Sequence, residues 1–97
     1  MQLPVTVGMS GPIPAIIVQG NAAYARGDLA AAKGAYEQAV ALQSDVAVAV
    51  FNLGVVHLRR GDRTRGHAEM DRGFALAAAH GMGSSTLEQM RSIRDRL

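Results

Sequence analysis

Apolar residues recur at three- and four-residue spacing from about residue 15 to the end of this chain, which is typical of amphipathic helices. The first 14 residues differ, because proline, glycine and β-branched residues there discourage helix and favour extended backbone. The pattern predicts an extended arm over residues 1–14 and an all-α domain over 15–97. Five helices are expected. The first two run over about 15–26 and 29–43, and the third runs from a cap at Ser44 or Asp45 to about Arg60. The last two run over about 63–80 and 85–97.

The polar interruptions between these helices repeat along the chain. The Arg-Gly-Asp triplet at 26–28 recurs at 60–62, and Gly20 recurs as Gly54, so both recurrences are 34 residues apart. A period of about 34 residues is typical of helix-turn-helix units that stack on one another, because one unit cannot bury its apolar face alone. The sequence therefore indicates a scaffold built from two units, followed by one further helix.

Residue chemistry at the repeated turns predicts where helices stop and start. Glycine readily adopts the left-handed conformation that ends many helices, so Gly27 and Gly61 are expected at helix C-termini. The aspartate that follows each glycine can accept hydrogen bonds from the first free backbone N–H groups of the next helix. A Ser-Thr-Leu-Glu run at 85–88 has the spacing of a capping box, which predicts the start of the last helix.

These residues resemble the tetratricopeptide repeat (TPR) family over about 13–80. The resemblance implies an α-solenoid, in which antiparallel helix pairs stack into a right-handed superhelix. It places repeat 1 at about 13–46, repeat 2 at about 47–80 and a capping helix at about 85–97. The family pattern falls on Gly20, Tyr24, Gly27, Ala32, Tyr36 and Ala39 in repeat 1, and on Leu53, Gly54, His57, Gly61, Gly66, Met70 and Gly73 in repeat 2. Glycine at the small positions should let the backbones of crossing helices approach closely.

The resemblance also predicts a binding surface, since the first helix of each pair lines the concave face in this family. We expect the groove to bind an apolar or amphipathic peptide segment, with Ile17, Phe51, Val55 and Leu58 as anchors. Two asparagines coincide with those of the family's carboxylate clamp, but Ile17 replaces its first lysine, so the full clamp is absent. The predicted groove residues are Ile17, Asn21, Tyr24, Val48, Phe51, Asn52, Val55, Leu58 and Arg59.

Self-association is an alternative function for such a module. The arm carries Leu3, Val5 and Val7 on one face of an extended segment, which could fill the chain's own groove or a neighbour's. The exposed ends of a short repeat array could also pair, giving a homo-oligomer. The sequence leaves recruitment of a protein partner and self-assembly both open.

Charge adds a third hypothesis without changing the fold. The formal net charge is only +2, but arginines cluster around the second turn, and a patch of Arg60, Arg63 and Arg65 could attract an acidic or nucleic-acid partner. We do not expect nucleic acid, because no aromatic residue interleaves the cluster to stack on bases. A solvated helix edge is the simpler interpretation.

Composition excludes several other classes. The chain has no cysteine, no glycine-rich phosphate loop after a strand and no recognisable catalytic group, so we expect neither an enzyme nor a cofactor. His67 and Asp71 are four residues apart on one predicted helix, but two ligands do not make a metal site. Prolines interrupt the early apolar run, which argues against a signal peptide or a membrane span and favours a cytoplasmic protein.

Overall fold

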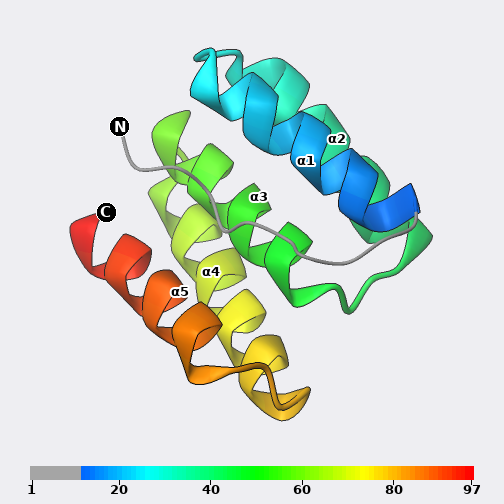
Figure 1. Ribbon diagram of the computed structural model, residues 1–97. Helices are drawn as coiled ribbons and strands as arrows, with labels where there is room; N and C mark the ends of the chain where they lie inside the picture. The colour runs from blue at the N-terminus through cyan, green and yellow to red at the C-terminus, as the bar shows by residue number, and fades with distance from the viewer. Residues whose placement is uncertain (1–11) are drawn as a thin grey trace.

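The computed structural model describes residues 12–97, which form five α-helices joined by short turns and contain no strand (Figure 1). The prediction of an all-α domain is confirmed. Residues 1–11 of the predicted arm, which was expected over 1–14, lie outside the described residues. The helices are α1 (Pro12–Ala25), α2 (Leu29–Leu42), α3 (Ala47–Arg59), α4 (Arg63–Ala79) and α5 (Ser84–Arg96).

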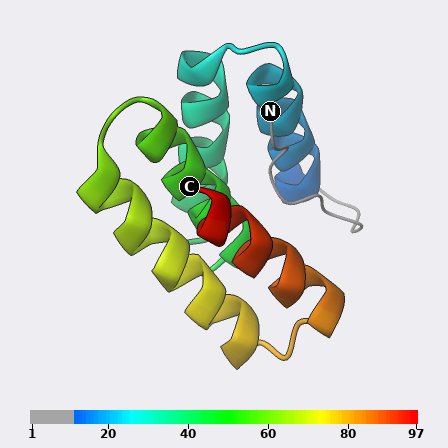
Figure 2. The same ribbon diagram turned by 90° about the vertical axis from the view of Figure 1, so that its left-hand side faces the viewer.

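Consecutive helices run antiparallel and lie side by side. α1 packs on α2, α2 on α3, α3 on α4 and α4 on α5, with the most extensive contact between α3 and α4. α1 also touches α3, so the first helices of the two hairpins are neighbours. In Figure 2 the α1–α2 hairpin is inclined to the three remaining helices, so the second hairpin is rotated relative to the first.

The two repeated turns have the conformation that their residues predict. Gly27 and Gly61 adopt positive φ angles of 82° and 100°. The side chains of Asp28 and Asp62 then cap α2 and α4 by accepting from a backbone N–H three residues on, at 3.1 and 3.2 Å. One helix therefore ends and the next begins within three residues, which keeps each hairpin tight.

Three helix starts differ from the prediction. α1 begins at Pro12, so the arm does not extend to residue 14; prolines are tolerated in a first helical turn, where the missing N–H would have no intrahelical partner. α3 is preceded by Val46, and Asp45 instead accepts a hydrogen bond from Gln43. α5 starts after Gly83 with no side-chain cap, so the predicted capping box does not form.

Glycine permits the close contact between α3 and α4, as the sequence predicts. A Cβ on Gly54 would stand 2.6 Å from the backbone oxygen of Gly66, and one on Gly66 would stand 2.8 Å from the oxygen of Gly54. A Cβ on Gly73 would meet Phe51 at 2.7 Å. The helix backbones therefore touch directly at these positions, and any larger residue would force them apart.

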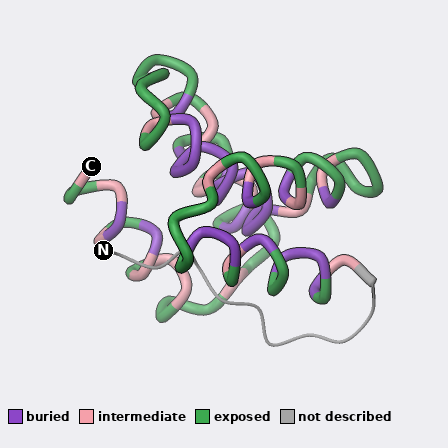
Figure 3. Tube along the Cα trace, turned by 90° about the horizontal axis from the view of Figure 1, so that it is seen from above, coloured by how far each residue is buried: buried purple, intermediate pink, exposed green. Residues whose placement is uncertain are grey.

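The core lies between the helices, and the turns and outer faces remain exposed (Figure 3). Residues 47–57 of α3 are all buried, because α3 is covered by neighbours on several sides. The largest fully buried side chains are Tyr24, Tyr36, Phe51, Ile17, Met70, Met90 and Ile93. None of the helices in the part of the chain that the structure describes is long and apolar enough to cross a bilayer.

The α3–α4 contact can be tested with two glycine-to-alanine changes. We expect Gly54→Ala to lower the free energy of unfolding by about 1–3 kcal/mol, because the added methyl meets backbone atoms of α4 that cannot rotate away. Gly34→Ala is the matched control in α2, where an added Cβ would meet nothing within 4 Å. This change should instead stabilise by about 0.5–1 kcal/mol. Urea unfolding of both variants measures the difference, and equal effects would contradict the predicted backbone contact.

Candidate functional site

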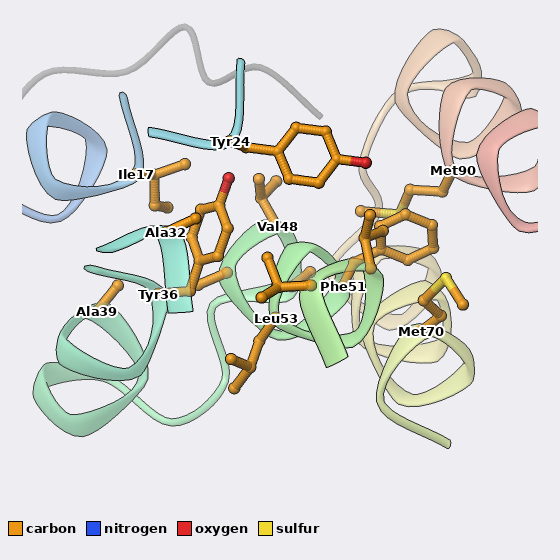
Figure 4. Close-up of a cluster of buried hydrophobic side chains, with 14 of the residues drawn as sticks. Ile17, Tyr24, Ala32, Tyr36, Ala39, Val48, Phe51, Leu53, Met70 and Met90 are labelled. Carbon is orange, nitrogen blue, oxygen red and sulfur yellow. The ribbon is translucent and has the colours of Figure 1, made fainter. Parts of the chain in front are cut away.

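Most of the predicted groove residues are buried. Ile17, Tyr24, Phe51 and Asn52 are 0% exposed, and Val55 is 1% exposed. Val48 is also buried, whereas Leu58 is half-buried and Arg59 is exposed. Figure 4 shows the labelled groove side chains packed with residues of α2, α4 and α5.

The prediction that Ile17, Phe51 and Val55 are exposed anchors therefore needs correction. A chain with only two phenylalanines and two tyrosines has few large side chains with which to fill its core. Both tyrosines and Phe51 are completely buried, and the branched residues of α1 and α3 fill the space beside them. Of the predicted groove residues, Asn21 and Leu58 are half-buried, and only Arg59 is exposed.

The two predicted asparagines lie next to each other and join three helices. The Asn21 Oδ1 atom in α1 accepts one hydrogen bond from the hydroxyl of Tyr36 in α2, at 2.5 Å. It accepts another from Nδ2 of Asn52 in α3, at 3.3 Å. The first bond joins α1 to α2 within the first hairpin, and the second positions that hairpin against α3. Such a bond adds about 1 kcal/mol and specifies how the helices pack.

Burial affects the acid–base behaviour of Tyr36. Desolvation, reinforced by nearby Tyr24, raises the pKa of the Tyr36 hydroxyl well above its ordinary value of 10.0. Tyr36 therefore remains neutral over the physiological range, and its hydroxyl donates a hydrogen bond to Asn21 Oδ1. This chemistry is structural, because the hydroxyl already has its partner inside the fold.

A second polar contact crosses between α3 and α4. His57 is buried, and its Nδ1 atom is in close contact with Glu69 Oε1, which also lies 3.5 Å from Arg65 Nε. The His57–Glu69 pair connects α3 to α4 beside the contact between Gly54 and Gly66. Within residues 12–97, no three histidine, aspartate or glutamate side chains are grouped so that they could hold a metal ion.

A surface pocket of about 410 Å³ lies where α3 and α5 end and α4 begins. We call it the arginine pocket. Three of its side chains are arginines, two are leucines, and none carries a negative charge. It is lined by Leu58, Arg59, Gly61, Arg63, Arg96 and Leu97.

Arg59 connects this pocket to α1. Its Nε atom donates to the hydroxyl of Tyr24 at 3.1 Å, and Tyr24 is completely buried. A rigid aromatic residue therefore orients this guanidinium. Of the predicted basic patch, only Arg63 lines the pocket; Arg60 is exposed outside it, and Arg65 is paired with Glu69.

Sequence reasoning missed Arg96 and Leu97. They lie 33 and 34 residues beyond Arg63, and no short-range motif relates them to the second turn. Only the packing of α5 on α4 brings them to the end of α3. A model of the helix stack could have suggested this neighbourhood, but the spacing of the arginines could not.

A second cavity, of about 280 Å³, lies mainly between α4 and α5, and its charged residues already have partners. Arg91 lies over the ring of Phe74, 5.7 Å from its centroid. Arg94 pairs with Asp71 at 3.1 Å. The arginines of this cavity are therefore already engaged within the fold.

Comparison of the chain with protein-family models, with curated proteins and with solved structures gave no match. The resemblance to the TPR family therefore rests on the residues described above.

The shifted pKa of Tyr36 predicts a stability change at alkaline pH. The folded state keeps the Tyr36 proton above pH 10.0, whereas the unfolded state releases it. The stabilisation is therefore complete below pH 10.0 and falls above it, by up to about 1.4 kcal/mol per pH unit. Phenylalanine does not ionise, so we expect the stability advantage of the wild type over Tyr36→Phe to shrink above this pH. Urea unfolding of both proteins from pH 8 to 11.5 tests this, and parallel pH curves would contradict it.

Proposed function

We propose that this chain is a protein-interaction module of the TPR type. Its peptide-binding surface lies on the side formed by α1, α3 and α5, at the end where the arginine pocket opens. Three features support this proposal: the 34-residue repeat, the antiparallel hairpins joined by glycine–aspartate turns, and the contact between first helices α1 and α3. A right-handed superhelical stack is part of the same proposal.

The composition of the arginine pocket is the main support for the proposed binding function. It combines half-buried leucine surface with exposed guanidinium groups, which can recognise both parts of an amphipathic segment. Leu58 and Arg59 belong to the groove predicted from the family resemblance. Binding at this pocket needs no rearrangement of the buried residues of α1 and α3.

Selection of peptides from a random phage-displayed library tests this function. We expect the folded chain to enrich peptides that carry both apolar and charged residues. In ¹⁵N-labelled protein, the enriched peptides should shift the amide signals of Leu58, Gly61, Arg63 and Leu97. The amide of Gly34, on the exposed side of α2, is an internal control. Failure to enrich any peptide, or shifts restricted to α2, would contradict the proposed surface.

Self-association is a second candidate, favoured by one comparison between the repeats. Ala15, Gln19 and Ala22 are exposed on α1, whereas the residues 34 positions later, Ala49, Leu53 and Val56, are buried on α3. Nearby Val18 is 54% exposed. The α1 face therefore has the position of a repeat interface but no neighbour within residues 12–97. A second copy of the chain could pack on it through closely approaching helices.

Sedimentation velocity over a concentration range tests this candidate. If α1 pairs with a second copy, the wild type should dimerise, and Val18→Glu/Ala22→Glu should shift the protein to monomer by placing like charges in the interface. Ser85→Glu/Ser92→Glu adds the same charge on α5 and should leave dimerisation unchanged. A wild type that remains monomeric at all concentrations would rule out this candidate while leaving peptide binding possible.

A further inference from the structure

We propose that the arginine pocket is a carboxylate-binding site for an acidic peptide, taking an aspartate or glutamate side chain with an adjacent apolar residue against its leucines. This inference rests on the proposed peptide-binding function and specifies its ligand. It joins Arg96 and Leu97 of α5 to residues at the end of α3 and the start of α4.

Two arginines outside this pocket pair with carboxylates, whereas among the described residues Arg59 and Arg63 inside it do not. Arg65 pairs with Glu69, and Arg94 pairs with Asp71. Within residues 12–97, no carboxylate side chain lies within ion-pair distance of Arg59 or Arg63. Arg59 and Arg63 therefore carry positive charge that no carboxylate side chain of the described residues neutralises. An incoming carboxylate would gain charge-assisted hydrogen bonds from Arg59 and Arg63 without displacing a carboxylate partner.

The geometry also favours binding because part of the site is already ordered. The Tyr24 hydroxyl holds Arg59 through Nε, which leaves the two Nη groups of that guanidinium for a ligand. A positioned arginine loses less side-chain entropy on binding than one that is free in solution. Leu58 and Leu97 are half-buried beside it and supply apolar surface. An acidic residue followed by an apolar one matches both parts of the pocket.

The aromatic residues favour a peptide over single-stranded nucleic acid. Nucleic-acid sites of this kind stack bases on exposed aromatic rings. Tyr24, Tyr36 and Phe51 are completely buried, and Phe74 has Arg91 over its ring. None of these rings lines the arginine pocket, so a base would find charge there but no stacking surface.

Fluorescence anisotropy with defined peptides tests the proposal on the full chain. The probe is a labelled ten-residue peptide of alternating leucine and aspartate or glutamate. Its control replaces the acidic residues with asparagine and glutamine. We expect the acidic peptide to bind at least about tenfold more tightly, and its affinity to fall as salt is added, because charge-assisted bonds supply the difference.

Protein variants locate the binding. We expect Arg63→Gln and Arg96→Gln to weaken the acidic peptide by about fivefold each, with little effect on the neutral peptide. Arg72→Gln removes the same charge about 13 Å further along α4 and should leave affinity unchanged. Arg63→Lys should restore only part of the affinity, because an ammonium group lacks the planar fork. Tyr24→Phe should weaken binding by loosening Arg59. Thermal unfolding of each variant checks that it is folded.

Three outcomes would overturn the inference. Equal loss in Arg63→Gln and Arg72→Gln would show attraction to net charge instead of a site. Tighter binding of a twenty-nucleotide single-stranded RNA would identify a nucleic-acid surface, and tighter binding of a phosphoserine version of the peptide would replace carboxylate by phosphate. If library peptides bind at the pocket but carry no acidic residue, the interaction function stands and only this ligand assignment fails.

Discussion

The direct contact between the backbones of α3 and α4 is the constraint on which the rest of the structure depends. Gly54 and Gly66 face each other across it, and Gly73 admits Phe51. Glycine has no side chain, so the two helix backbones come within the short range over which dispersion forces act. A whole helix face can then contribute to packing. A chain poor in aromatic residues gains stability from this arrangement that it could not obtain from large side chains.

Close packing also determines which side chains remain at the surface. The residues of α1 and α3 that could have lined an open groove are enclosed by α2, α4 and α5 instead. Asn21 and Asn52 support this enclosure by bonding across helices. The surface left at the ends of α3 and α5 is small, but it has both apolar and cationic groups. The proposed recognition of a partner at a helix end is compatible with a fold that uses its helix faces internally.

Most of the charged side chains between the helices have partners within the fold. The two capping aspartates satisfy helix N-termini, Glu69 contacts His57 and Arg65, and Asp71 pairs with Arg94. Within residues 12–97, no carboxylate side chain is left within ion-pair distance of Arg59 or Arg63. The uncompensated charge at Arg59 and Arg63 therefore arises from the arrangement of carboxylates, since the net charge of the chain is only +2.

The sequence by itself determined the features that depend on neighbouring residues. Gly27 and Gly61 end helices and the following aspartates cap the next ones, since both effects follow from local backbone chemistry. The family resemblance, in turn, implied the close approach at Gly54 and Gly66. The helix start at Pro12 was missed because proline discourages a helix interior yet fits a first turn.

Only the tertiary structure decided which side chains of α1 and α3 are enclosed, and that Arg96 and Leu97 join Arg63. Burial depends on the competition of all five helices for contact, and residues more than 30 positions apart meet only after the helices have packed.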